Sequence, residues 1–205
     1  MKAFLGLDIS MNSTGCVFHI HGQDGQADIT KFMRICPSVE KNSESAELVT
    51  YNRTWAKGNY STMDLATVVD AKRLAARISG LIKRFTSQYG ITELSVRTEG
   101  HIMGGRFQKQ SRMTQMVSFN TIMKLMLLSN DTVTDIATIA PTALKKYATG
   151  KGRCKKEEIV KHFMLKFPDF DRTGKIDDIA DAYFLATAQL TKEKGWCKST
   201  NEYNF

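Results

Sequence analysis

Four carboxylates occupy positions where an unpartnered negative charge would destabilise a fold. Asp8 and Glu99 each end a short apolar run, and Asp178 and Asp181 lie three residues apart inside an otherwise apolar helical segment. Burying such acids is unfavourable unless a cation or hydrogen bonds satisfy them. We therefore interpret the four acids, called here the acidic cluster, as a candidate site for divalent cations.

The ligand type indicates which cation would fit. The acidic cluster has no histidine or cysteine partner in these motifs, and carboxylate oxygens suit hard cations such as Mg²⁺ or Mn²⁺. Two such ions about 4 Å apart can bind the attacking water and the leaving oxygen of a phosphodiester. The predicted reaction is hydrolysis with two ions per site. The alternative is that these acids form ordinary surface salt bridges.

The chain is basic, which favours a polyanionic partner. It holds 29 Lys and Arg against 21 Asp and Glu, for a formal net charge of +8, and much of the excess lies within 145–175. A glycine loop with cations, at 149–153, can follow a phosphate chain but lacks the P-loop spacing. The alternative is a solvated helix face. The candidate DNA-binding residues are Lys145, Lys151, Arg153, Lys155, Lys156, Arg106 and Lys109.

Strand and helix patterns predict a mixed α/β domain. Apolar runs bounded by turn residues predict strands at 3–8, 16–21, 29–36, 91–99 and 134–140, the first three forming an antiparallel meander. Helical periodicity predicts helices at 63–88, 113–128, 142–147, 155–167 and 177–192. The order implies a five-stranded sheet, antiparallel and then parallel, with helices on both faces. We expect one domain over 1–205, a loop or insertion at 37–61, and a flexible tail at 194–205.

This architecture explains how distant acids could meet. Asp8 and Glu99 end strands that lie side by side if they are parallel neighbours, and ligands tend to bind at such carboxyl ends. Asp178 and Asp181 are three residues apart on a helix, so both point the same way. A helix packed across the strand ends would complete the cluster.

Other features exclude several classes of protein. The four cysteines match no zinc pattern, which favours free thiols in a reducing compartment. The N-terminus reaches Asp8 too soon for a signal peptide, and no apolar run approaches the roughly 20 residues that span a bilayer. We expect a cytoplasmic protein with no membrane contact and no small-molecule cofactor. The methionines of helix 113–128 favour a core or a subunit interface.

Three motifs resemble one known family. The segment Leu-Gly-Leu-Asp-Ile-Ser-Met-Asn-Ser-Thr-Gly at 5–15 is similar to the first-strand motif of RuvC-type Holliday junction resolvases. The stretch 141–156, which runs from a proline through a Gly-x-Gly turn into a helix, resembles that family's basic segment. Asp-Ile-Ala-Asp-Ala at 178–182 is similar to its closing acid motif. The three motifs occur in the family's order and span the chain.

The resemblance implies a ribonuclease H-like fold, a homodimer, and metal-dependent, symmetric nicking of four-way DNA junctions. It also implies that the acidic cluster supplies the catalytic acids, and that Lys145 and Lys156 lie near the DNA. Asp177 is an additional acid that could bind metal in place of Asp178 or beside it.

Two features depart from the family's pattern. An aromatic residue often follows the catalytic glutamate in the family and wedges into the junction, whereas here the candidates are Ile102, Met103 and Phe107. The connection at 37–61 is also longer than usual. Such divergence suggests a phage-type or similarly remote member.

Three other functions remain open at this stage. The nearest alternative is a less selective branched-DNA or flap endonuclease on the same fold. A non-catalytic DNA-binding protein would not need all four acids. An actin-like phosphotransferase shares the first-strand acid and glycine turn, but its second phosphate loop and adenosine motif are not evident.

Overall fold

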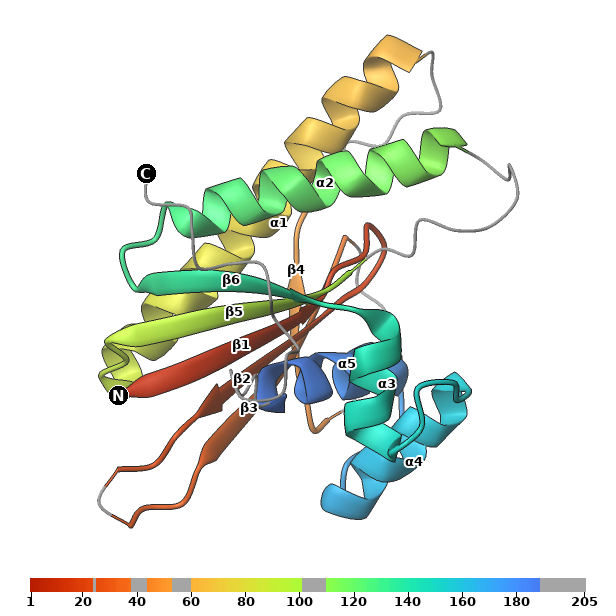
Figure 1. Cartoon of the computed structure of the whole chain (residues 1–205). Coiled ribbons are helices and arrows are strands. Elements are labelled where there is room, and N and C mark those ends of the chain that lie inside the picture. The colour runs from red at the N-terminus through yellow and green to blue at the C-terminus, as the bar shows by residue number, and fades with distance from the viewer. Residues whose placement is uncertain (24, 38–43, 53–59, 101–109, 189–205) are drawn as a thin grey trace.

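The chain folds around one mixed sheet, shown in a computed structural model (Figure 1). The structure describes residues 1–23, 25–37, 44–52, 60–100 and 110–188. The strand order is β4-β3-β2-β1-β5-β6. The strands are β1 (Lys2–Asp8), β2 (Thr14–Ile20), β3 (Ile29–Cys36), β4 (Glu47–Thr50), β5 (Glu93–Glu99) and β6 (Val133–Ile139). The helices are α1 (Tyr60–Tyr89), α2 (Gln110–Leu128), α3 (Pro141–Thr149), α4 (Lys156–Lys166) and α5 (Ile176–Thr187).

The pairing confirms the predicted fold class. β1, β2 and β3 form an antiparallel meander, and β5 and β6 run parallel to β1. Helices cover both faces: α1 and α2 lie on one side of the sheet, and α3, α4 and α5 lie on the other (Figure 1). The described helices lie within a few residues of their predicted bounds. α5 ends at Thr187, so the predicted extension to 192 is not helical at residue 188 and then leaves the described residues.

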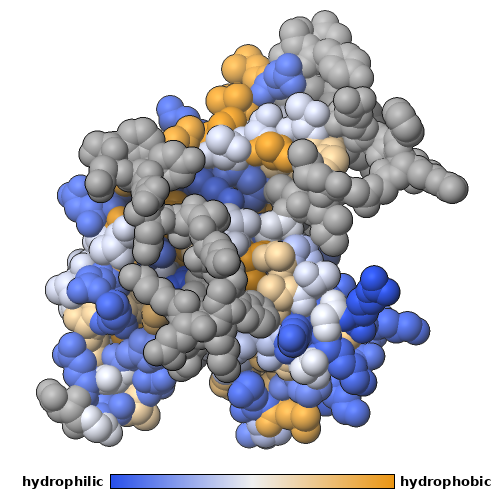
Figure 2. Space-filling model, in the orientation of Figure 1, coloured by the Kyte–Doolittle hydropathy of each residue, from blue (hydrophilic) through white to orange (hydrophobic). Residues whose placement is uncertain are grey.

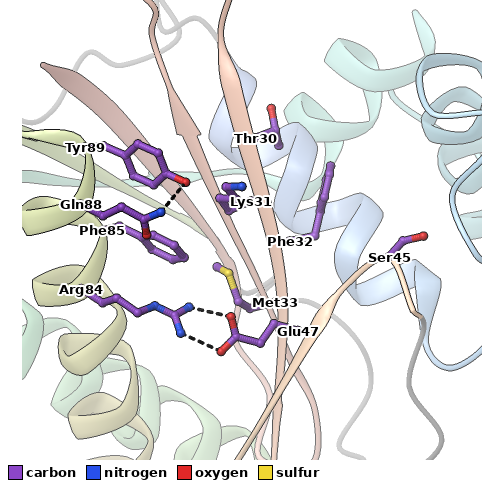
Figure 3. Close-up of a pocket in the computed structure, with 10 residues that line it drawn as sticks. All are labelled: Thr30, Lys31, Phe32, Met33, Ser45, Glu47, Arg84, Phe85, Gln88 and Tyr89. Carbon is purple, nitrogen blue, oxygen red and sulfur yellow. Dashed lines mark hydrogen bonds and ion pairs between the residues drawn. The ribbon is translucent and has the colours of Figure 1, made fainter.

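The sheet has a sixth strand that the sequence did not predict. β4 lies within 37–61, which was expected to be a loop, and it runs parallel to β3 at the sheet edge. The strand has only four residues and no fully buried side chain, so it carries little local signal. The Arg84 guanidinium holds it to α1, donating to both carboxylate oxygens of Glu47 at 2.9 and 2.6 Å (Figure 3). A tertiary contact therefore stabilises what local sequence does not specify.

The two faces of the sheet bury separate cores. Leu5 and Leu7 of β1 point toward α1 and α2, where they join a core that includes Leu74, Ile78 and Phe119. The other face packs on α5, and its core includes Val17, Ile139, Phe163, Ala182 and Phe184. Because side chains alternate along a strand, Asp8 lies on the α5 face.

Two glycines let α5 lie directly on the sheet. A β-carbon at Gly6 would overlap the Ala182 carbonyl oxygen, and one at Gly15 would overlap the Asp178 carbonyl oxygen. The absence of a side chain at these positions is what lets the backbones approach so closely. α5 is accordingly rich in small residues, and nine of its residues are buried. Gly6 and Gly15 therefore set the distance between α5 and the sheet, and with it the positions of Asp178 and Asp181.

Two further features bear on the class of protein. Within the described ranges, no helix is long and apolar enough to cross a bilayer. Cys16 and Cys154 are free thiols, and burial raises the pKa of the Cys16 thiol. The predicted tail at 194–205 lies outside the described residues.

Candidate active site

Asp8 and Glu99 lie side by side at the carboxyl ends of neighbouring parallel strands. Leu7 of β1 is in register with Thr98 of β5, so the next residue on each strand is an acid. Both side chains lie on the α5 face, because Val96 of β5, like Leu7, belongs to the opposite core. Sheet geometry alone therefore brings two of the four acids together.

The start of α5 supplies the other two acids. Asp178 and Asp181 are buried, with 8% and 7% of their surfaces exposed. The carbonyl of Asp178 sits over Gly15, which is the partner of Asp8 in the β1–β2 pair. The close approach of α5 thus places both aspartates over the ends of β1 and β2, beside Asp8.

The electrostatics show that the acids act on one another. Burial raises the pKa of Asp8 to about 8, with further contributions from the negative charges of Asp181, Asp178 and Glu99. Burial and the Asp181 charge raise the pKa of Glu99 to about 6, and burial also raises that of Asp181 to about 6. Raised carboxyl pKa values mean that positive charge at this point would be strongly favourable.

Lys156 is the cation that the structure places against the cluster. Its Nζ lies 2.8 Å from Asp177 Oδ2, 3.5 Å from Asp181 Oδ2 and 3.8 Å from Asp178 Oδ1. Burial lowers its pKa, but the hydrogen bond to Asp177 and the nearby acid charges outweigh this, so the pKa is raised overall. The carboxyl pKa values stay high despite this ammonium group, first because the acids are buried and then because their negative charges repel one another.

The sequence left open whether Asp177 or Asp178 belongs to the acidic cluster, and the structure distinguishes the two side chains. The side chain of Asp178 is mostly buried, and its charge acts on Asp8. The side chain of Asp177 is 37% exposed and pairs with Lys156, which helps to hold its pKa low despite burial. The geometry favours Asp178 as a member of the cluster and Asp177 as the residue that positions Lys156.

A series of buried hydrogen bonds reaches Asp178, and the sequence analysis did not predict it. Ser13 Oγ donates to Asp178 Oδ2 at 2.5 Å, and Arg34 Nε donates to Ser13 Oγ at 2.9 Å. Arg34 is only 1% exposed and is the largest fully buried side chain described. An arginine inside the apolar strand 29–36 was the signal available in the sequence. We infer that Ser13 and Arg34 orient Asp178.

The basic residues divide into two groups. Lys145 on α3 lies near the acids, because its charge lowers the pKa of Glu99. Lys151, Arg153 and Lys155 are exposed on the connection from α3 to α4, which begins at Gly150 in a left-handed conformation. Figure 2 shows hydrophilic residues gathered over α3 and α4 at lower right. A basic surface therefore lies next to the acidic cluster.

Several predicted site residues lie outside the described residues. These are the wedge candidates Ile102, Met103 and Phe107 and the DNA-binding candidates Arg106 and Lys109. Their roles stay predictions.

The arrangement fits hard cations. The cluster offers carboxylate oxygens from β1, β5 and α5, and burial together with the negative charge of neighbouring acids raises their pKa values.

The raised pKa of Asp8 predicts an unusual pH dependence of stability. Between its unfolded value of 3.8 and its folded value of about 8, the folded protein binds more protons than the unfolded chain. The free energy of unfolding therefore falls as pH rises through this window. We expect urea unfolding in chelator to show this fall, and Asp8→Asn to reduce the slope. Equal slopes for the two proteins would contradict the coupling.

Comparison with known proteins agrees with this fold. No family model matches the chain, and no curated protein is significantly similar in sequence. Among solved structures, Thermus thermophilus RuvC matches with a TM-score of 0.52 and 14% identity over 90% of both chains. The same protein in complex with a Holliday junction substrate matches with a TM-score of 0.52 and 12% identity, again over 90% of both. The yeast mitochondrial Holliday junction resolvase Ydc2 matches with a TM-score of 0.45 and 11% identity, over 89% of this chain and 75% of that one.

The class of fold follows from the two RuvC matches. The chain has the mixed α/β fold of RuvC, with six strands and five helices in its described part. At such low identity the likeness establishes architecture, and what the site does has to be argued from its own residues.

Proposed function

We propose that this chain is a metal-dependent endonuclease that resolves four-way DNA junctions by symmetric phosphodiester hydrolysis. The observation that carries the proposal is the convergence of Asp8, Glu99, Asp178 and Asp181 on one face of a RuvC-like sheet, beside an exposed basic segment. The structurally similar RuvC was solved in complex with a Holliday junction substrate, which supports this class of DNA for the present chain.

The four acids would hold Mg²⁺ or Mn²⁺, with two ions per site. When bound, these ions supply positive charge to the phosphate in the transition state and activate the attacking water. The chain positions the ligands by three means: strand register sets Asp8 beside Glu99, α5 brings Asp181, and Ser13 orients Asp178.

Lys156 has a separate role in this proposal. Its Nζ sits within 4 Å of three carboxylates, so it partly compensates the acids before cations enter. Asp177 holds the ammonium group at 2.8 Å and keeps it at the edge of the cluster. From there Lys156 can contact a phosphate of the bound strand.

The exposed cations of the α3–α4 connection would bind the DNA backbone. Each phosphate contact that is lost lowers the slope of log K against log salt by about 0.9. We expect Lys151→Ala with Arg153→Ala to weaken junction binding and to reduce that slope by about 2, as measured by fluorescence anisotropy over a salt series. The matched control is Lys72→Ala with Arg77→Ala, which removes the same charge from exposed positions of α1. An equal loss of slope in both variants would count against a dedicated basic surface.

Symmetric nicking requires two active sites, and we propose a homodimer. The outer side of α1 and α2 exposes large apolar residues, namely Leu65, Val68, Val117, Leu125 and Leu128. Apolar residues are visible over these helices in the upper part of Figure 2. Of the methionines on α2, Met123 is buried in the core, while Met113, Met116 and Met126 are partly exposed.

A single substitution tests this surface. Leu125 is 62% exposed on α2, and burying a glutamate at its position in an interface would weaken association by about 30-fold or more. We expect Leu125→Glu to be monomeric by light scattering at concentrations where the natural sequence is dimeric. Leu165→Glu is the control, because Leu165 is 70% exposed but lies on α4. If the natural sequence is monomeric both with and without junction DNA, the homodimer proposal is wrong.

Cleavage of three labelled substrates tests the proposed function. We expect Mg²⁺-dependent, paired and symmetric nicks in a four-way junction, with little cutting of flap or linear duplex DNA. Equal cutting of all three substrates would instead favour the less selective branched-DNA endonuclease. No cutting of any substrate, with either Mg²⁺ or Mn²⁺, would contradict the proposal.

A further inference from the structure

A second group of side chains of types that can ligate a metal lies at the other end of the same sheet face. His19 of β2 is in register with Phe4 of β1, which is four residues, or about 13 Å, from Asp8. His21 follows β2, and Asp28 immediately precedes β3, so the hairpin brings the three together. We call His19, His21 and Asp28 the histidine cluster. It shares no residue with the acidic cluster and is separated from it by the length of α5.

The spacing in the sequence explains why both imidazoles face one point. Residues i and i+2 of an extended segment lie on the same side of a sheet. The rings of His19 and His21 accordingly pack edge to face, with centroids 5.0 Å apart. Asp28 lies across the hairpin from both of them.

Two of the three separations between the ligand atoms match those of a tetrahedral zinc site. Asp28 Oδ2 lies 3.2 Å from His19 Nε2 and 3.3 Å from His21 Nδ1, and all three atoms lie within 4.8 Å of one another. Tetrahedral Zn²⁺ with bonds of about 2.0–2.1 Å places neighbouring ligand atoms roughly 3.3 Å apart. A small shift of the three side chains would admit an ion.

The remaining polar atoms of two cluster residues are already held. His19 Nδ1 lies 3.1 Å from Thr30 Oγ1, and Asp28 Oδ1 accepts a hydrogen bond from the Gly22 backbone N–H at 3.0 Å. In the tautomer that donates from Nδ1 to the Thr30 hydroxyl, Nε2 would offer its lone pair to an ion, which is the arrangement found at protein metal sites. These contacts leave Nε2 and Oδ2 directed at the same point.

We propose that the histidine cluster binds one Zn²⁺ ion, or a similar borderline transition metal, through His19 Nε2, His21 Nδ1 and Asp28 Oδ2. The fourth position would face a cavity of about 510 Å³ that the three residues line together with Phe4, Arg97 and Tyr183. Two nitrogen ligands and one carboxylate suit Zn²⁺ far better than Mg²⁺. The ion would close the β2–β3 hairpin, since its ligands come from both arms. This site is independent of the proposed nuclease function.

The competing explanation is a hydrogen-bonded pair of imidazoles around one carboxylate, with no metal. The two explanations differ in what Zn²⁺ does to the protein. A ligand that binds only the folded state raises the unfolding temperature, whereas hydrogen bonds alone give no such response.

Calorimetric titration of Zn²⁺ into the full chain tests the site, with excess Mg²⁺ present to occupy the acidic cluster. We expect one equivalent to bind and to raise the unfolding temperature. Asp28→Asn and His21→Gln should weaken this binding by about 100-fold and remove the thermal shift. His21→Gln is the second variant because His21 is partly exposed, so its replacement leaves the core intact. Co²⁺ in place of Zn²⁺ should give visible absorption typical of a tetrahedral site, and both variants should lose it.

Three further variants exclude other zinc ligands. His162→Gln and Cys154→Ser remove a histidine and a thiol elsewhere in the chain, and Asp8→Asn removes a member of the acidic cluster. All three should bind Zn²⁺ as the natural sequence does. Failure of the natural sequence to bind Zn²⁺, or equal binding by Asp28→Asn, would overturn the proposal. Loss of binding in Asp8→Asn alone would place the ion at the acidic cluster and would also overturn it.

Discussion

Replacement of Asp8 by asparagine is expected to abolish junction cleavage while leaving junction binding intact. Asp8 lies among the other three acids, and its removal would take away a ligand at the centre of the cluster. A bound metal stabilises the transition state by several kcal/mol, so the cleavage rate of the variant should fall by about 10³-fold. Single-turnover cleavage of a labelled junction in Mg²⁺ measures the rate, and anisotropy in Ca²⁺ or chelator measures binding.

The fold of this variant should survive. The pKa of Asp8 is about 8, so in the metal-free protein its carboxyl group is mostly protonated at neutral pH, and asparagine resembles that form. By the same linkage, the thermal unfolding temperature of Asp8→Asn in chelator at neutral pH should be higher than that of the natural sequence. Glu157→Gln is the matched control, because it removes an exposed acid on α4 beside Lys156 and should cleave normally. Full cleavage activity in Asp8→Asn would show that Asp8 is not part of the active site.

Substitution of Gly15 by alanine is expected to impair both folding and cleavage. The new β-carbon would overlap the backbone carbonyl of Asp178, so α5 would have to move away from β2. Such overpacking destabilises a protein by about 1–3 kcal/mol. The displacement carries Asp178 and Asp181 away from Asp8, so cleavage should fall by far more than the change in folded fraction explains. Urea unfolding and single-turnover rates at low temperature, where the variant stays folded, separate the two effects.

The control for this variant is Gly80→Ala. Gly80 lies on the exposed side of α1, and a β-carbon there would meet nothing within 4 Å. Alanine in a helix interior is favoured over glycine by about 0.5–1 kcal/mol, so this variant should be slightly more stable and fully active. If Gly15→Ala cleaves as well as Gly80→Ala, the distance between α5 and the sheet does not determine the cleavage activity.

The sequence was sufficient to predict five of the six strands and a point where the acids could meet. Apolar runs bounded by turn residues predicted β1, β2, β3, β5 and β6. The structure shows that β1 and β5 are parallel neighbours, which was the condition for Asp8 and Glu99 to lie side by side. The three-residue spacing of Asp178 and Asp181 predicted that both side chains lie on the same side of α5. The catalytic assignment of these residues stays a prediction, because the structure shows where they lie and not what they bind.

The features that the sequence missed all depend on tertiary contacts. β4 is stabilised by the Arg84–Glu47 pair, and the two residues are 37 positions apart in the chain. The sequence did not predict that Lys156 lies against the acids, a contact that arises because α4 packs on α5, and its predicted contact with DNA stays a prediction. The hydrogen-bonded chain runs from Arg34 on β3 through Ser13, which precedes β2, to Asp178 on α5, and no local pattern encodes it.

The central claim is that the four acids form one divalent-cation site, and anomalous diffraction from crystals grown with Mn²⁺ tests it most directly. The account predicts anomalous peaks among the carboxylates of Asp8, Glu99, Asp178 and Asp181, with Lys156 displaced toward Asp177. Crystals of Asp8→Asn should lose at least one of these peaks. A cluster without anomalous signal at saturating Mn²⁺, with Lys156 still against Asp181, would contradict the account.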